Sequence, residues 1–170
     1  LFAELGWLAI PFAEEHGGLD GNDVDLSLMF EEFGKAIVVE PYLANVVLGG
    51  GILKRSDLED KSKYIEGIIS GESQVSLANY EPTKGFNLAN VDCEISSDGN
   101  VNGLKTTVLN AQNANYFVVF GKQEDSYAFA LVSKDAEGLN CTSYKTYDGF
   151  VSGDVKFNNC KAEAVFSTSN

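Results

Sequence analysis

The chain has 170 residues, 44% of them hydrophobic, and a formal net charge of −13. The apolar content excludes an intrinsically disordered protein, and the length allows one domain or two small ones. No run of lysine or arginine reaches three residues, which argues against nucleic acid or an anionic membrane as a partner. No apolar stretch approaches the roughly 18 residues that cross a bilayer. We therefore expect a folded protein with neither of these partners.

The three cysteines, Cys93, Cys141 and Cys160, are odd in number and widely spaced. The sequence has no Cys-x-x-Cys pair, and its one histidine, His16, cannot anchor a metal cluster or a Ser-His-Asp arrangement. We predict three unpaired thiols, no metal site and an intracellular, soluble protein. We expect His16 to make a hydrogen bond within its loop.

Up to about Gly71 the apolar residues recur with helical spacing. One apolar stripe runs from Leu26 to Ile37, and Asn22 or Asp23 precedes it as a candidate N-cap. The order of these signals predicts a helix that begins at residue 22 or 23.

Pro41 suits the first turn of a second helix, which extends to Leu53. The run Gly49-Gly50-Gly51 inside it costs about 1 kcal/mol per glycine, which close packing against a neighbouring element would offset. Ser56-Asp57-Leu58-Glu59 has the pattern of a capping box for a third helix, which Gly71 ends.

After Gly71 the apolar period changes to two, which is typical of strands. The expected strands are Gln74–Ala78, Ala89–Ile95, Val101–Leu109, Tyr116–Gly121, Tyr127–Ser133, Leu139–Tyr147 and Gly153–Phe157. Short strands at near-regular spacing indicate an antiparallel barrel or sandwich. The predicted class is α+β, with an all-α helical domain over 1–73 followed by an antiparallel β-barrel domain over 74–170.

Six segments, in order along nearly the whole chain, resemble motifs of the acyl-CoA dehydrogenase family. They are Glu4–Leu19 (family ELGxxGxPxxxEYGG), Leu28–Ala36 (LVLEELGRA), Lys61–Glu72 (KxxYLPxLxxGE), Glu81–Gly85 (TEPxxGSD), Asn102–Asn115 (NGxKxWITNGxxA) and Asp148–Phe157 (a barrel strand). The resemblance implies an N-terminal helical domain, a middle β-barrel and a C-terminal helical domain, with FAD between the last two and acyl-CoA packed against the flavin.

In that family a glutamate base removes the α-proton of the acyl-CoA, and a hydride passes from the β-carbon to the flavin. The base lies in the C-terminal domain of most members. The chain begins without methionine and ends at Asn170, just past the barrel. We therefore expect a truncated chain that lacks the C-terminal helical domain and carries no catalytic residue.

The resemblance also places the cofactor contacts of the chain. They are Tyr80, Glu81, Gly85, Phe86, Thr107 and Leu109, with Phe86 also facing the substrate. Tyr80, Phe86 and Leu109 replace hydroxyl residues that bond the flavin or substrate in the family, and Thr107 replaces a tryptophan that packs against the ring.

The residues also permit a purely structural interpretation, which stays open beside the first. Glu81–Gly85 then forms a barrel loop in which Gly85 has positive φ, and Thr106–Leu109 forms an ordinary alternating strand. Lys105 is interpreted as a surface charge of a hairpin.

Three functions fit these observations. In the first, the chain is a fragment of an FAD-dependent acyl-CoA dehydrogenase that oxidises acyl-CoA thioesters in fatty-acid or related catabolism. Alternatively, it is a non-catalytic subunit that assembles as a homo- or hetero-oligomer with acyl-CoA dehydrogenase-type chains. Acyl-CoA oxidases and flavin monooxygenases share the fold and form a third possibility. We expect the 170-residue chain alone to be inactive and to bind FAD weakly, and we expect a bacterial cytoplasm rather than a mitochondrial matrix.

Overall fold

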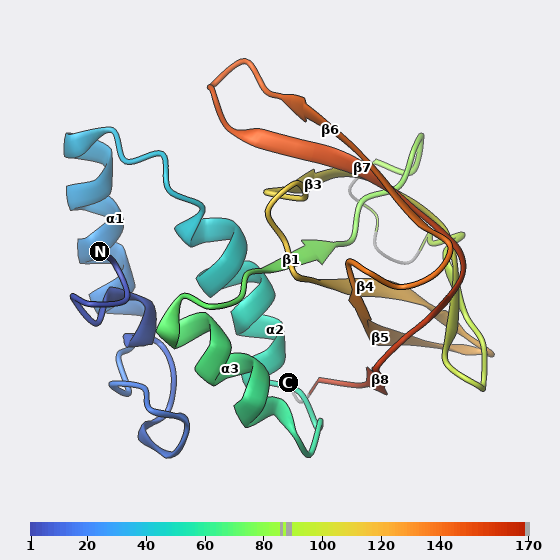
Figure 1. Ribbon diagram of the computed structural model, residues 1–170, viewed down its shortest axis with the longest axis horizontal. Helices are drawn as coiled ribbons and strands as arrows, with labels where there is room; N and C mark the ends of the chain where they lie inside the picture. The colour runs from blue at the N-terminus through green and yellow to red at the C-terminus, as the bar shows by residue number, and fades with distance from the viewer. Residues whose placement is uncertain (86, 88–89, 169–170) are drawn as a thin grey trace.

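The computed structural model describes residues 1–85, 87 and 90–168, which form a helical layer beside a β-sheet (Figure 1). The helical elements are η1 (Trp7–Ala9), η2 (Glu14–His16), α1 (Asp23–Ala36), η3 (Leu43–Gly49), α2 (Gly50–Lys54) and α3 (Lys61–Ser70). The strands are β1 (Val75–Ala78), β2 (Glu94–Ile95), β3 (Asn100–Leu109), β4 (Tyr116–Gln123), β5 (Ser126–Ser133), β6 (Leu139–Lys145), β7 (Val151–Lys161) and β8 (Ala164–Phe166). The helices precede the strands, which confirms the α+β class.

Helix α1 begins at the cap that the sequence predicts. The side chain of Asn22 accepts hydrogen bonds from the backbone N–H groups of Val24 and Asp25, at 2.8 and 3.4 Å. The Asp25 carboxylate in turn accepts one from the Asn22 N–H, at 2.8 Å. This reciprocal capping box satisfies N–H groups that have no partner inside the helix. The helix ends at Ile37, whose backbone is left-handed, with φ 53°.

The predicted glycine-rich second helix is a π-helix, η3, continued by α2, and it packs closely against its neighbours. A methyl group added to Gly49 would lie 2.5 Å from the Val75 carbonyl oxygen, and one added to Gly50 would lie 2.7 Å from the Phe12 ring. The absence of side chains therefore lets this helix approach β1 and Phe12. The expected close packing against neighbouring elements is therefore present at Gly49 and Gly50.

The capping box predicted at residues 56–59 is wrong. Helix α3 begins later, at Lys61, and its N-cap residue Asp60 makes no side-chain capping bond. The Ser56 hydroxyl donates instead to the Leu53 carbonyl oxygen, at 2.7 Å. Asp57 binds the end of the chain, because its carboxylate accepts hydrogen bonds from the backbone N–H and the hydroxyl of Ser167, at 2.9 and 2.6 Å.

The sheet departs from the predicted antiparallel barrel in two ways. Its strand order is β6-β7-β3-β2-β4-β5-β8, with β1 also paired to β4. The β1–β4 and β2–β4 pairs are parallel, so the sheet is mixed. Within the described residues, β6 and β8 end this order without pairing to each other, so the barrel is not closed. The segment between β1 and β4 contains two further strands and is long enough for the crossover that a parallel pair requires.

Two hydrophobic cores share the sheet. The first is formed by side chains of the strand region alone and includes Val101, Val108 and Phe117. The second lies between the helices and the sheet, where Phe12 and Ile65 pack with Val75 of β1. The helical layer is therefore held on the sheet by a continuous apolar contact.

The three cysteines are unpaired, as predicted. Cys93 and Cys160 are fully buried, whereas Cys141 on β6 is partly exposed. Burial raises the pKa of the Cys93 thiol to about 11 and raises that of Cys160 as well. The two buried thiols are thus held in their neutral form.

The contacts of the glycine run predict different outcomes for neighbouring alanine substitutions. Gly49→Ala should lower the free energy of unfolding by about 1–3 kcal/mol, because the new methyl group meets a backbone carbonyl that cannot rotate away. Gly51→Ala is the matched control: its methyl group would lie 3.6 Å from the flexible Arg55 side chain, and it should be neutral or stabilising by up to about 1 kcal/mol. Urea denaturation of both variants checks this, and equal stabilities would refute the packing argument.

The bond between Asp57 and Ser167 predicts a local response to pH. Hydrogen bonds from the Ser167 hydroxyl and N–H hold the pKa of Asp57 below its ordinary value of 3.8. A lowered pKa means that the contact is intact above the ordinary value and is lost as pH falls through the lowered value. The NMR shift of the Ser167 amide should therefore titrate with a midpoint below 3.8. This transition should disappear in Asp57→Asn, and its persistence there would assign it to another group.

Candidate functional site

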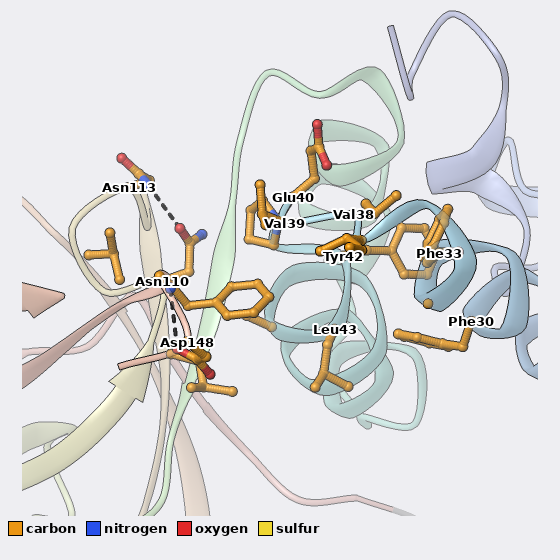
Figure 2. Close-up of a pocket in the computed structure, with 18 residues that line it drawn as sticks. Phe30, Phe33, Val38, Val39, Glu40, Tyr42, Leu43, Asn110, Asn113 and Asp148 are labelled. Atoms are coloured by element: carbon orange, nitrogen blue, oxygen red, sulfur yellow. Dashed lines mark hydrogen bonds between the residues drawn. The ribbon is translucent and has the colours of Figure 1, made fainter. Parts of the chain in front are cut away.

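A pocket of about 570 Å³ lies between the helical layer and the end of the sheet (Figure 2). Phe30 and Phe33 of α1 and Leu43 of η3 form its helical side, and Leu109 and Phe150 stand on the sheet side. The remaining lining residues are Gly34, Ile37–Tyr42, Ala44, Asn110, Asn113, Asp148, Gly149 and Val151. Its size and mostly apolar wall are typical of a small-molecule pocket. Such a wall suits an apolar chain or a flat ring.

The polar groups beside this pocket are bonded to one another. The Asn110 side chain donates to Gln74 Oε1 at 2.6 Å. The Asn113 side chain donates to Asn110 Oδ1 at 2.8 Å (Figure 2). The hydroxyl of Thr146 and the N–H of Phe150 donate to Asp148 and hold the pKa of this carboxyl below its usual range. Asp148 is therefore ionised and bound within its own turn, which does not suit it to be a general base.

Strand β3 is bulged at Thr107, one of the residues that the family resemblance places beside the flavin. Its pairing with β7 shifts between Lys105 and Val108, so that two residues of β3 lie opposite Asp154. Thr107 sits in the bulge with a φ of 54°, a conformation that costs a β-branched residue about 1–3 kcal/mol. Its N–H donates to the Asp154 carboxylate at 3.2 Å. The expectation of an ordinary strand at Thr106–Leu109 is therefore wrong.

Beyond the bulge, Leu109 lies directly opposite Ser152 of β7. Val108 points into the core, so Leu109 and Ser152 share the other face of the sheet. The Ser152 hydroxyl is buried and has no hydrogen-bond partner among the described residues. A buried hydroxyl without a partner is unfavourable by about 1–3 kcal/mol. Leu109 itself supplies no hydroxyl, but its neighbour does.

The interpretation of Lys105 as a surface charge is wrong. The Lys105 side chain is fully buried, and its Nζ lies 2.7 Å from Glu81 Oε1. Although burial raises the pKa of Glu81, bonds from Lys105 and from the N–H groups of Asp92 and Cys93 hold it below its ordinary value. The Glu81 carboxylate is therefore ionised at neutral pH.

The other predicted contacts lie on the segment that follows β1. The Tyr80 carbonyl oxygen accepts a bond from the Thr106 N–H at 2.8 Å, which places this segment beside the bulge of β3. Gly85 has a φ of 61°, as the loop interpretation predicted, and a Cβ there would meet open space. Phe86, the predicted substrate contact, lies outside the described residues. The structure thus joins Tyr80 and Glu81 to β3, whereas Leu109 lines the pocket further along that strand.

The pocket itself was not predicted from the sequence. Phe30 and Phe33 were interpreted as part of an apolar stripe, which marks a buried face but does not show that part of the face borders a pocket. Ser152 carried no signal beyond its place in a strand motif. Only the tertiary arrangement brings these residues together.

The described residues show neither a metal cluster nor a catalytic histidine. No group of three or more potential metal ligands occurs in this part of the chain. His16 is buried, and its Nδ1 lies 2.8 Å from the hydroxyl of Ser62 on helix α3. The hydrogen bond is structural, but it joins the loop to a helix and does not lie within the loop as expected. Over the same residues, no helix has the length and apolar character needed to span a bilayer.

Comparison with known proteins identifies relatives of both halves. Residues 1–72 match the family model described as "Acyl-CoA dehydrogenase, N-terminal domain". Probable acyl-CoA dehydrogenase YngJ of Bacillus subtilis is 32% identical over 152 residues, which are 82% of this chain and 40% of the relative. The chain therefore spans about two fifths of that relative's length.

Solved structures share the fold across nearly the whole chain. An acyl-CoA dehydrogenase complexed with FAD from Bacillus anthracis has a TM-score of 0.85 and 22% identity, covering 98% of this chain and 31% of that one. The ChsE4-ChsE5 complex from Mycobacterium tuberculosis has a TM-score of 0.82 and 24% identity, covering 96% of this chain and 44% of that one. The solved structures show the common fold, and the matched family model and the curated relative show that the chain belongs to the acyl-CoA dehydrogenase family.

Proposed function

We propose that this chain forms the helical wall and the sheet wall of the acyl-thioester site in an FAD-dependent oxidoreductase that dehydrogenates acyl-CoA. The observation that carries the proposal is the apolar pocket of about 570 Å³ between α1, η3 and the end of β3. Leu109, a predicted flavin contact, lines this pocket, so the proposed places of cofactor and acyl chain adjoin. No described residue is assigned as the base.

The residues of this wall fit one side of a flavin ring, with few hydrogen-bond donors. Leu109 provides an apolar surface, and the buried Ser152 hydroxyl beside it has no partner among the described residues. The Thr107 N–H is already bonded to Asp154. Tyr80, Gly85 and Phe86 are proposed to contact the cofactor, whereas the carboxylate of Glu81, the other predicted contact, is bound to Lys105 and to the N–H groups of Asp92 and Cys93. When bound, FAD would accept the hydride, and this chain would orient the ring and exclude water.

A second candidate function is that of a non-catalytic subunit assembled with an acyl-CoA dehydrogenase-type partner. Leu109 lacks the expected hydroxyl, and the bond from Thr107 to Asp154 occupies a backbone donor on the proposed flavin side. One of the similar solved structures is itself a complex of two named proteins. Co-purification distinguishes the functions: a colourless chain that acquires flavin absorbance only with a partner chain supports the assembly function.

We also propose an intracellular location, with the bacterial cytoplasm as the first choice. The support is the absence of disulfides among three cysteines, which is the usual state in a reducing compartment.

The proposed place of Leu109 beside the flavin predicts how substitutions of this residue change the affinity for FAD. Leu109→Thr should bind FAD roughly 2- to 10-fold more tightly than Leu109→Val, because one added hydrogen bond contributes about 0.5–1.5 kcal/mol. The two variants have similar shapes, so the comparison isolates the hydroxyl. Quenching of FAD fluorescence and the flavin absorbance spectrum measure the affinities. Equal affinities would remove Leu109 from the flavin wall, and bleaching of the unmodified chain by acyl-CoA without oxygen would show that it is active alone.

A further inference from the structure

The most unusual charges in the chain are those of Glu81 and Lys105, which lie almost wholly out of contact with solvent. Their side chains are 4% and 0% exposed, and the two charged atoms are 2.7 Å apart. Removing two charges from water opposes folding, and an apolar pair of similar volume is often no less stable. Stability alone therefore does not explain why this pair is buried here.

The pair joins three parts of the chain that are distant in sequence. Lys105 Nζ on β3 donates to the Asn79 carbonyl oxygen, at 3.4 Å, as well as to Glu81. Glu81 accepts hydrogen bonds from the N–H groups of Asp92 and Cys93, at 2.7 and 3.0 Å. Asn79 and Cys93 are the two ends of the segment that leaves β1 and returns to β2. The first end of this segment, 79–93, is thus bonded to Lys105 directly, and the second end is bonded to it through Glu81.

We propose that Glu81 and Lys105 are positioning residues, which hold the two described ends of segment 79–93, at residues 79–81 and 92–93, together beside strand β3. This inference rests on the proposed function, since the segment contains three other proposed cofactor contacts, Tyr80, Gly85 and Phe86. The pair does not itself need to touch the cofactor. Its geometry sets where the segment leaves and rejoins the sheet, next to the bond between the Thr106 N–H and the Tyr80 carbonyl oxygen.

A nearby ion pair provides a matched control. Lys84 Nζ lies 2.9 Å from Asp92 Oδ2, so this pair also spans the segment, but the Asp92 side chain is 74% exposed. An exposed ion pair contributes little to stability because solvent screens it. Lys84→Met removes a lysine charge from the same segment without disturbing the buried pair.

The test is hydrogen exchange of segment 79–93 in the 170-residue chain, measured by mass spectrometry. The variants are Glu81→Gln, the apolar double variant Glu81→Leu/Lys105→Met, and the control Lys84→Met. In the first two, exchange in this segment should rise about tenfold or more, the effect of losing one charge-assisted hydrogen bond. Exchange in α3, β4 and β5 should stay as in the unmodified chain, and Lys84→Met should leave the segment unchanged.

Two outcomes would overturn the proposal. Exchange that rises equally throughout the chain would make the pair a general stability element, and unchanged exchange in segment 79–93 would show that other contacts hold it. FAD affinity, measured in parallel, should fall in Glu81→Gln relative to the unmodified chain. If the unmodified chain binds no FAD, the proposed function is in doubt, while the exchange experiment still decides the positioning role.

Discussion

The arrangement of the chain depends on the backbone contact between strand β1 and the helical layer. The Val75 N–H donates to Asn45 Oδ1 of η3 at 2.8 Å, and Gly49 has no Cβ to block the approach to the Val75 carbonyl oxygen. β1 also pairs in parallel with β4, so one short strand belongs to the sheet and to the helical packing. The helical layer and the sheet meet at this strand (Figure 1), and the pocket is bordered by both layers.

The sequence was most informative where local chemistry decides the structure. The capping residue Asn22 and the left-handed glycine at Gly71 were predictable because their partners lie within one helical turn. The spacing of apolar residues changes from helical to alternating after Gly71. This change separated helices from strands, because the spacing also follows from local backbone geometry. The capping box at Ser56 failed because Ser56 pairs with Thr168, which is far along the chain, and its hydroxyl donates to the Leu53 carbonyl oxygen.

The site was less predictable because it depends on long-range pairs. The alternation of β3 places Lys105 on the same face as Val101, but a lysine is rarely buried without a partner, and Glu81 lies on another segment. The bulge at Thr107 could not be inferred either, since a β-branched residue disfavours positive φ. The family resemblance located the segments that border the pocket, and the structure alone shows which side chains of those segments meet.

The unequal burial of the three thiols makes the chain convenient for optical experiments. Cys93 and Cys160 are enclosed in the core, and burial raises the pKa of both, so neither supplies much thiolate to an alkylating dye. Cys141 is the partly exposed thiol, on β6 of the hairpin whose tip carries the pocket residue Phe150. A maleimide fluorophore can thus be attached at one position of the unmodified sequence, where its emission would report movement of the hairpin over the pocket.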